Sequence, residues 1–230
     1  VAYLNVDIAC AGGHHFYGKG TPQLATLMKE VAAEVEIAAT TRDDVAEHGG
    51  SGSSKKGGSD GAGKVPVAPE TILENWVKYR KETPLFDTAG AGSDFAPFLQ
   101  LIGVPVVDFR FTSDYYSVYH STEDNYYWMS NYGDPDFAYH TAIAKMWSLL
   151  TFRLATDPVI PFNFTDYADH LDLYVEQIDN DENGCSKKHS ISLLPLRQAI
   201  DRLHAAGVAA EKFRSRQWNV PPPPPPPPPP

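Results

Sequence analysis

The sequence predicts an α/β unit followed by a helical unit. Up to His120, strand-like stretches rich in β-branched and aromatic residues alternate with stretches whose apolar residues recur at helical spacing. In chain order these stretches are 1–6, 21–35, 71–80 and 103–111. Beyond His120 only helical patterns follow, over 136–155, 166–178 and 193–213. This change of pattern predicts a first domain of residues 1–133 and a second, helical domain of residues 134–218.

The first elements follow from local patterns. Residues 1–6 have the composition of a buried strand that is already in progress, which leads us to expect a piece of a longer protein. Residues 11–20 are rich in glycine and predict a loop. Thr21 and Pro22 then fit the N-cap and the first position of a helix.

The helix expected over 136–155 has one apolar stripe, and the two helical patterns after it have similar stripes. The stripe consists of Phe137, His140, Ala144, Trp147 and either Leu150 or Leu154. Residues three and four apart share one face of a helix, so we expect these side chains to face the core.

The net charge excludes one class of partner. The 230 residues include 29 acidic and 19 basic side chains, which gives a formal net charge of -10. An acidic protein repels the phosphates of nucleic acid, so no nucleic acid partner is expected. The only cysteines, Cys10 and Cys185, are too few and too far apart for a disulfide framework or a CxxC metal site. No apolar run reaches the ~20 residues that a membrane span requires.

Two segments of low complexity are expected to stay outside the core. Residues 48–64 are almost entirely Gly, Ser, Lys, Asp and Ala, and they predict a flexible loop because they have little apolar surface to bury. Residues 219–230 consist of Asn219, Val220 and ten consecutive prolines, and we expect this tail to be disordered. A polyproline II ligand for an aromatic groove is one interpretation of this tail, and an artefact of sequence translation is the other.

Polar side chains at the ends of predicted strands are the first site candidates. Asp7 ends the first strand, where open α/β sheets place site residues, although an aspartate there also suits a turn. Tyr119 and His120 offer a phenol for an oxyanion and an imidazole for a metal ion. Asp124 is a candidate partner for the second nitrogen of that ring. A buried histidine with satisfied hydrogen bonds is the alternative interpretation of His120.

A segment of small residues precedes the last predicted strand and supplies further candidates. Gly92 and Ser93 lie in this segment, where small side chains let the backbone approach a ligand, so both are candidate substrate-binding residues. Ser93 is alternatively a helix N-cap. On the strand, Asp108 and Arg110 share one face, which indicates either the wall of a cleft or an ion pair.

Four stretches stand in an order that is specific to one family: VAYLNVD, GAGSDFAPFLQLIGVPVVDFRF, VYHSTEDNYYWM and DPVIPFNFTDYADHLDLY. With these stretches the sequence resembles the glutamate carboxypeptidase II family of dinuclear zinc peptidases, especially its plant members related to the altered meristem program protein. The resemblance extends from residue 1 to about residue 215, apart from the Gly/Ser loop.

The resemblance implies a partial zinc-peptidase domain with a mixed central sheet and a truncated all-α domain like the transferrin receptor dimerisation domain. It also implies two zinc ions, a homodimer formed through the helical domain, and removal of a C-terminal, often acidic, residue from a peptide substrate. By position, Asp7 and His120 match ligands of the two zinc ions. Tyr119 matches the tyrosine that hydrogen-bonds the tetrahedral intermediate, and Arg110 matches an arginine of the substrate cleft. Asp124 stands where the family carries a glutamate, so its role behind His120 is a hypothesis.

The sequence departs from the family pattern in ways that affect function. The other zinc ligands and the general base are expected before residue 1, and the clamp for the substrate carboxylate after Val220, so we expect the chain alone to be inactive. Asp108 stands in place of a second cleft arginine, and Ser93 in place of a frequent asparagine, which weakens the case for a glutamate preference.

The resemblance leaves a second functional class open. Transferrin receptors are non-catalytic relatives that use the same fold for dimerisation and binding, but they have lost zinc ligands. Retention of Asp7, Tyr119 and His120 therefore favours the enzyme. The resemblance further implies that the parent protein is anchored upstream of this chain in a membrane of the endoplasmic reticulum or elsewhere in the secretory pathway.

Overall fold

The computed structural model describes residues 1–43, 64–80, 86–113, 116–180 and 191–218. The proline tail, Cys185 and all but the last residue of the Gly/Ser loop lie outside the described residues. The first elements are β1 (Tyr3–Asn5), β2 (His15–Gly20), η1 (Pro22–Leu24), α1 (Ala25–Glu34), β3 (Glu36–Ile37), β4 (Thr40–Asp43), β5 (Lys64–Val67), β6 (Glu70–Thr71) and α2 (Ile72–Arg80). They are followed by β7 (Asp87–Thr88), α3 (Phe95–Pro97), η2 (Phe98–Ile102), β8 (Val106–Thr112), α4 (Tyr126–Trp128), η3 (Met129–Gly133), α5 (Ala138–Thr156), α6 (Thr165–Asn180) and α8 (Leu194–Trp218).

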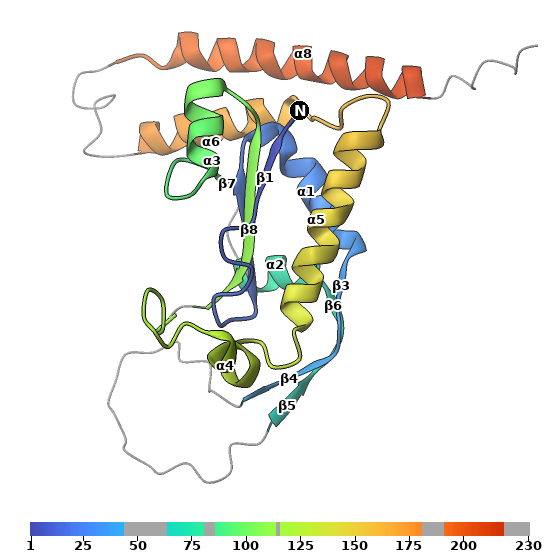
Figure 1. Cartoon of the computed structure of the whole chain (residues 1–230). Coiled ribbons are helices and arrows are strands. Elements are labelled where there is room, and N and C mark those ends of the chain that lie inside the picture. Colours follow the sequence, from blue (N-terminus) through green and yellow to red (C-terminus); the bar gives the residue numbers. More distant parts are fainter. Residues whose placement is uncertain (44–63, 81–85, 114–115, 181–190, 219–230) are drawn as a thin grey trace, which may run out of the picture.

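A small mixed sheet with the strand order β1-β8-β2-β7 forms the centre of the α/β unit (Figure 1). β1 runs parallel to β8, with Asn5 beside Asp108. β8 runs antiparallel to β2, with Arg110 beside Tyr17, and β2 runs parallel to β7. The α/β class and the mixed sheet that the sequence suggested are therefore observed, and the small sheet is compatible with part of a larger domain.

The strand β2 corrects the loop that the glycines of residues 11–20 predicted. Phe16 is 3 % exposed, and the strand alternates between buried and half-buried residues. A Cβ on Gly18 would lie 3.1 Å from the Trp76 ring, and one on Gly20 would lie 2.4 Å from the Val106 carbonyl oxygen. Glycine is therefore needed here because neighbours fill the space of a side chain, and not because the chain turns.

One face of the sheet holds the main hydrophobic core, together with α1, α2 and α5 (Figure 1). The sheet contributes Phe16, Phe109 and Phe111 to it, and α2 contributes Trp76. The helix η1 begins at Pro22 as expected, but the Thr21 side chain does not cap it. Its hydroxyl instead accepts a hydrogen bond from the Val106 backbone N–H at 3.2 Å, which ties η1 to β8.

The helix α5 turns a different face to the core from the one predicted. Its buried residues are Ala138, Tyr139, Ala142, Ile143, Met146 and Leu150. Of the predicted stripe only Leu150 is among them, while Ala144 and Trp147 are exposed. Because α5 packs on the sheet and shares its core, the boundary between residues 133 and 134 stays a prediction.

The last two helices, α6 and α8, pack against each other at one end of the molecule (Figure 1). Ala168 and Val175 of α6 form a small core with Ile200 of α8. This core is smaller than the one beside the sheet, and much of the apolar surface of both helices is exposed. Among the described helices, none has the length and hydropathy that a membrane span requires.

Candidate functional site

The parallel pair β1 and β8 determines where the predicted zinc ligands lie. Asp7 follows the end of β1 and is exposed to solvent. Tyr119 and His120 lie in the segment that follows β8. Both segments follow the carboxyl ends of parallel strands. After Asp7 the chain continues beside β8, where Cys10 pairs with Phe111, whereas His120 lies beyond the end of β8.

The segment after β8 presents Tyr119 and His120 to solvent. The Tyr119 side chain is 52 % exposed, and its ring stacks on the His120 imidazole with 3.8 Å between centroids. His120 has a φ of 59°, the left-handed conformation, in a turn closed by the hydrogen bond from the Ser121 N–H to the Val118 carbonyl. Such a conformation is uncommon for a residue other than glycine and is often found at functional sites. An exposed imidazole is not the buried, satisfied histidine that was the alternative.

The Asp124 carboxylate is engaged by a neighbouring tyrosine. It accepts a hydrogen bond of 2.6 Å from the Tyr116 hydroxyl. Burial, and then this hydrogen bond, raise the pKa of Tyr116 well above its usual range. The place of Asp124 behind His120 stays a prediction, because the contact that the structure gives this carboxylate is with Tyr116.

Ser93 belongs to a polar network under the sheet edge. The Asn5 side-chain amide donates to the Ser93 hydroxyl at 2.9 Å and to the Asp108 carboxylate at 2.8 Å. The Lys19 ammonium lies 3.5 Å from the other carboxylate oxygen of Asp108. The N-cap of α3 is Asp94 and not Ser93, and the Asp94 side chain makes no capping hydrogen bond. Gly92 has a φ of +98° with open space at its Cβ position.

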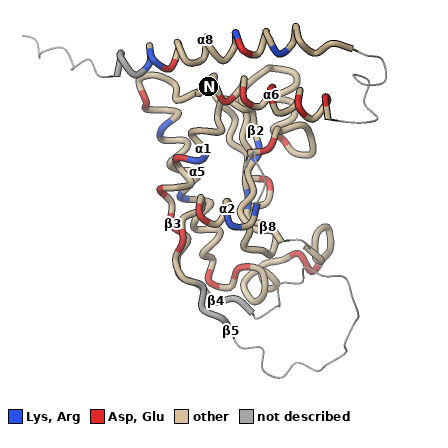
Figure 2. The backbone as a smooth tube through the Cα atoms, turned by 180° about the vertical axis from the view of Figure 1, so that it is seen from behind, with Lys and Arg blue, Asp and Glu red and all other residues tan. Residues whose placement is uncertain are grey.

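The network explains Asp108, the residue that replaces a cleft arginine. The Asp108 side chain is 5 % exposed and its charge is paired with Lys19, so the ion-pair interpretation of this strand holds for Asp108. The partner of Asp108 is Lys19 and not Arg110. Lys19 of β2 thus lies opposite Asp108 of β8. Figure 2 shows basic residues in blue along these two strands.

Arg110 lies in a second group, around Tyr17. The guanidinium groups of Arg110 and Arg80 each lie 5.5 Å from the Tyr17 ring centroid. Arg80 also forms an ion pair of 2.5 Å with Asp87. Burial, and then a hydrogen bond with Asp87, raise the pKa of Tyr17 to about 12. The Arg110 Nε is buried without a hydrogen-bond partner in the described part of the chain, so this arginine retains a free donor.

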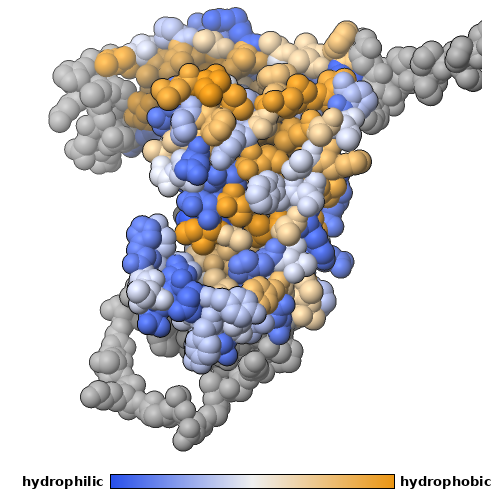
Figure 3. Space-filling model, viewed as in Figure 1, coloured by the Kyte–Doolittle hydropathy of each residue, from blue (hydrophilic) through white to orange (hydrophobic). Residues whose placement is uncertain are grey.

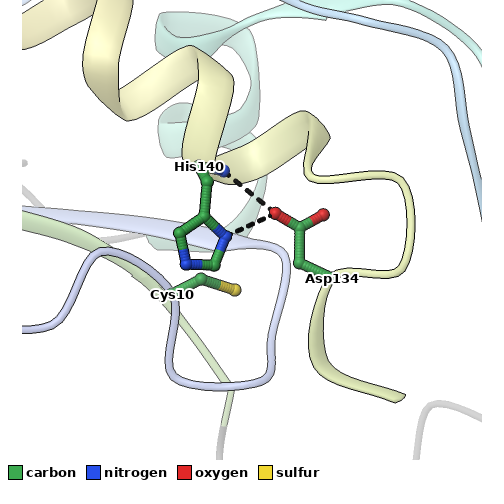
Figure 4. A group of neighbouring side chains, drawn as sticks. All are labelled: Cys10, Asp134 and His140. Carbon is green, nitrogen blue, oxygen red and sulfur yellow. Dashed lines mark hydrogen bonds and ion pairs between the residues drawn. The ribbon is translucent and has the colours of Figure 1, made fainter. Parts of the chain in front are cut away.

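Three residues that the sequence patterns did not bring together form a cluster (Figure 4). Cys10, Asp134 and His140 each offer a metal-ligating atom, and these atoms lie within 4.8 Å of one another. We call this group the Cys10 cluster. One Asp134 oxygen, Oδ2, lies 2.7 Å from the His140 Nδ1 and accepts a hydrogen bond from the His140 backbone N–H at 3.0 Å. The predicted stripe had assigned His140 to packing, and nothing in the local sequence linked it to Cys10.

We expect Cys10 to resist thiol reagents in the folded chain. Burial, and then the Asp134 carboxylate, raise the pKa of the thiol from 9.0 to about 12. A raised pKa in the folded state favours folding fully below pH 9, and this contribution is lost as the pH rises from 9 to about 12. With Cys185→Ala removing the other thiol, alkylation at neutral pH should be at least about 100-fold slower in the folded chain than in denaturant. Similar rates in both states would contradict the burial of Cys10.

No protein-family model matches the chain. Individual known proteins are similar to it along most of its length. It is 36 % identical over 206 residues to the probable glutamate carboxypeptidase LAMP1 of Arabidopsis thaliana, covering 90 % of this chain and 25 % of that protein. It is 31 % identical over 226 residues to the probable glutamate carboxypeptidase VP8 of Zea mays, covering 94 % and 28 %. It is 27 % identical over 223 residues to the aminopeptidase NAALADL1 of Rattus norvegicus, covering 91 % and 26 %.

These similarities extend over almost the whole chain, while the chain spans about a quarter of the length of these relatives. The plant proteins share more identical residues with it than the rat protein does. The family suggested by the four sequence stretches is thereby confirmed, and the chain belongs to the glutamate carboxypeptidase family as a plant-type member.

Proposed function

We propose that this chain forms part of the active site of a zinc-dependent carboxypeptidase that removes a C-terminal residue from peptides. The observation that carries this proposal is the parallel pairing of β1 with β8. Asp7 and the pair Tyr119 and His120 each follow the carboxyl end of one of these two strands, and all three residues are exposed. Family membership supports a peptidase, since relatives are named carboxypeptidases and aminopeptidases.

The donor chemistry of these residues fits zinc. An aspartate carboxylate and a neutral imidazole are two of the three ligand types that zinc prefers, and both side chains are exposed. A bound zinc pair would supply a water of lowered pKa and polarise the scissile carbonyl. In this proposal Asp7 and His120 each hold one ion. The exposed hydroxyl of Tyr119, kept beside His120 by ring stacking, donates a hydrogen bond to the oxyanion of the intermediate.

The substrate side of the proposal depends on Arg110. Arg110 is half-buried, and its positive charge favours an acidic substrate. Asp108 adds no positive charge and is already paired with Lys19. We therefore propose a weaker preference for glutamate than two cleft arginines would give. We also propose that the chain alone is inactive, because Asp7 and His120 provide one ligand to each ion where about three are needed.

Zinc binding to variants of the chain tests the metal role of His120. We expect the chain to bind zinc weakly, and we expect His120→Ala to lower the zinc affinity at least about tenfold. Mutation of a residue that only hydrogen-bonds a metal ligand already lowers metal affinity by ~10–100-fold, so loss of the ligand itself should cost at least as much. The measurement is calorimetric titration in a Cys10→Ala background, so that the Cys10 cluster does not contribute. His204→Ala is the matched control, since His204 lies on α8 with its side chain 49 % exposed. Equal affinities of the His120→Ala and parent chains would reject the role.

The helical end of the molecule supports a proposal about assembly. Several large apolar side chains of α6 and α8 are exposed, and Figure 3 shows hydrophobic side chains gathered at this end. They include Tyr167, Ile178, Leu194, Leu196, Leu203 and Phe213. Exposed apolar surface of this kind is typical of an interface. We propose that α6 and α8 contribute to a homodimer of the parent protein, which we place at a membrane of the secretory pathway.

A further inference from the structure

The Cys10 cluster joins two parts of the chain that are far apart in sequence. Cys10 lies after β1, Asp134 lies between η3 and α5, and His140 lies in the first turn of α5. Cys10 is 1 % exposed and Asp134 is also 1 % exposed, while the His140 side chain is 32 % exposed. Two of the three donors are thus inside the protein, and the imidazole connects them to solvent.

The hydrogen bonds of the cluster leave part of it unsatisfied. The Oδ1 atom of Asp134 is buried and has no hydrogen-bond partner among the described residues. In the same part of the chain its one ion-pair partner is His140. The Cys10 sulfur lies 3.5 Å from the Gly13 carbonyl oxygen and 4.0 Å from the Gly133 carbonyl oxygen, and both contacts are long. A buried carboxylate with an unpaired oxygen is costly, and a bound cation would remove that cost.

The three donors differ in a way that selects the ion. Thiolate sulfur and imidazole nitrogen favour zinc and similar transition ions, whereas calcium and magnesium take oxygen ligands. Around a tetrahedral zinc ion with bonds of about 2.0–2.3 Å, the donor atoms lie roughly 3.3–3.7 Å apart. The donors here lie within 4.8 Å of one another, and the closest pair is 2.7 Å apart. Shifts of about 1 Å would therefore produce a zinc geometry.

We infer that Cys10, Asp134 and His140 form a binding site for a divalent transition ion, zinc in the first instance, that fastens the loop after β1 to the start of α5. On binding, the Cys10 thiol gives its proton to solvent and its sulfur bonds to the metal. Water, or one of the Gly13 and Gly133 carbonyls, completes four ligands. This site uses none of the residues assigned to the peptidase reaction, so it stands independently of the proposed function.

Cobalt titration of the full chain tests this inference, because cobalt replaces zinc and reports its ligands by colour. A thiolate bound to cobalt gives an intense charge-transfer band in the near ultraviolet, which carboxylate and imidazole ligands do not give. We expect the band in the Cys185→Ala chain and its loss in the Cys10→Ala chain. His140→Gln should weaken cobalt binding at least about tenfold, and His204→Gln should leave it unchanged. Absence of the band in the folded Cys185→Ala chain would overturn the site.

Thermal unfolding in the presence of zinc gives a second readout, which does not depend on the colour of a bound ion. Zinc should raise the unfolding temperature of the Cys185→Ala chain, because a ligand that binds only the folded state stabilises it. His120→Ala is added to this chain and to its variants, so that the other proposed zinc site does not contribute. The increase should disappear in His140→Gln, whose side chain is half-buried and tolerates exchange better than Cys10. If Cys10→Ala fails to fold, the His140→Gln chain decides the question by both readouts. An undiminished temperature increase in His140→Gln would reject His140 as a ligand and with it the site.

Discussion

Asp108→Ala is expected to lower the free energy of unfolding by about 3 kcal/mol, because removing one partner of a buried pair leaves the other unpaired. The Asp108 side chain is 5 % exposed, and its carboxylate neutralises Lys19, which lies 3.5 Å away. It also accepts the hydrogen bond from Asn5, whose side chain is itself buried. Alanine would leave the ammonium and the amide of these two partners facing an apolar gap at the centre of the sheet.

Denaturant unfolding of the variant and two controls would separate the causes. Asp108→Asn keeps the shape and can still accept from Asn5, so it should lose only part of that stability. Asp94→Ala removes an exposed carboxylate from the same unit and should change the free energy of unfolding by less than about 0.5 kcal/mol. A loss for Asp108→Ala that is as small as the loss for Asp94→Ala would show that the network does not stabilise the sheet.

The same network has a consequence for substrate preference. If Asp108 were part of an open cleft, its carboxylate would repel an acidic substrate directly. Because it is buried and paired with Lys19, its charge is largely hidden from the proposed substrate. Arg110 remains, held over the Tyr17 ring, as the basic group of this strand. The substitution at residue 108 is therefore accommodated inside the protein.

Local patterns predicted the parts of the fold that local chemistry determines. The stretches 1–6 and 103–111 are apolar enough to be strands in any context, and they form β1 and β8. The strand β2 could not be predicted, because Gly18 and Gly20 are required by Trp76 and Val106, which are distant in sequence. Tertiary packing decided that strand against its local propensity.

The helix α5 shows a different limit of pattern reasoning. Its residues are apolar on more than one side, so two stripes compete for the core. Trp147 is 43 % exposed, while Met146 beside it is 0 % exposed. Periodicity indicates a helix in both cases but does not choose between the stripes, because the choice depends on which face meets Phe111 and α1.

Partners that are distant in sequence limited the prediction of the site in the same way. Asp7, Tyr119 and His120 could be predicted as site residues because a short motif and a strand end mark them, and their roles stay predictions. The contact of Ser93 with Asn5 spans 88 residues, and no spacing rule applies over such a distance. The Cys10 cluster was missed for this reason, since its members gain chemical meaning only when the fold brings them together.

Trp76→Ala is expected to cost about 3–5 kcal/mol, because a large aromatic side chain in a packed core leaves a cavity that its neighbours fill only in part. Trp76 is 0 % exposed, and its ring centroid lies 5.0 Å from that of Phe16 and 6.4 Å from that of Phe86. It also covers the space above Gly18, so its loss would loosen β2, the strand that carries Tyr17. The substitution therefore affects the strand beside Arg110 as well as the core.

Comparison with Trp147→Ala and Trp76→Phe makes this prediction specific. Trp147 lies 43 % exposed on α5, so its replacement should cost less than about 1 kcal/mol in denaturant unfolding of the chain. The indole N–H of Trp76 is buried without a hydrogen-bond partner among the described residues, and phenylalanine removes that unpaired donor. Trp76→Phe should therefore lose much less stability than Trp76→Ala. Equal losses for Trp76→Ala and Trp147→Ala would mean that α2 does not pack under β2 in solution, and the sheet face with Tyr17 and Arg110 would have to be held by other contacts.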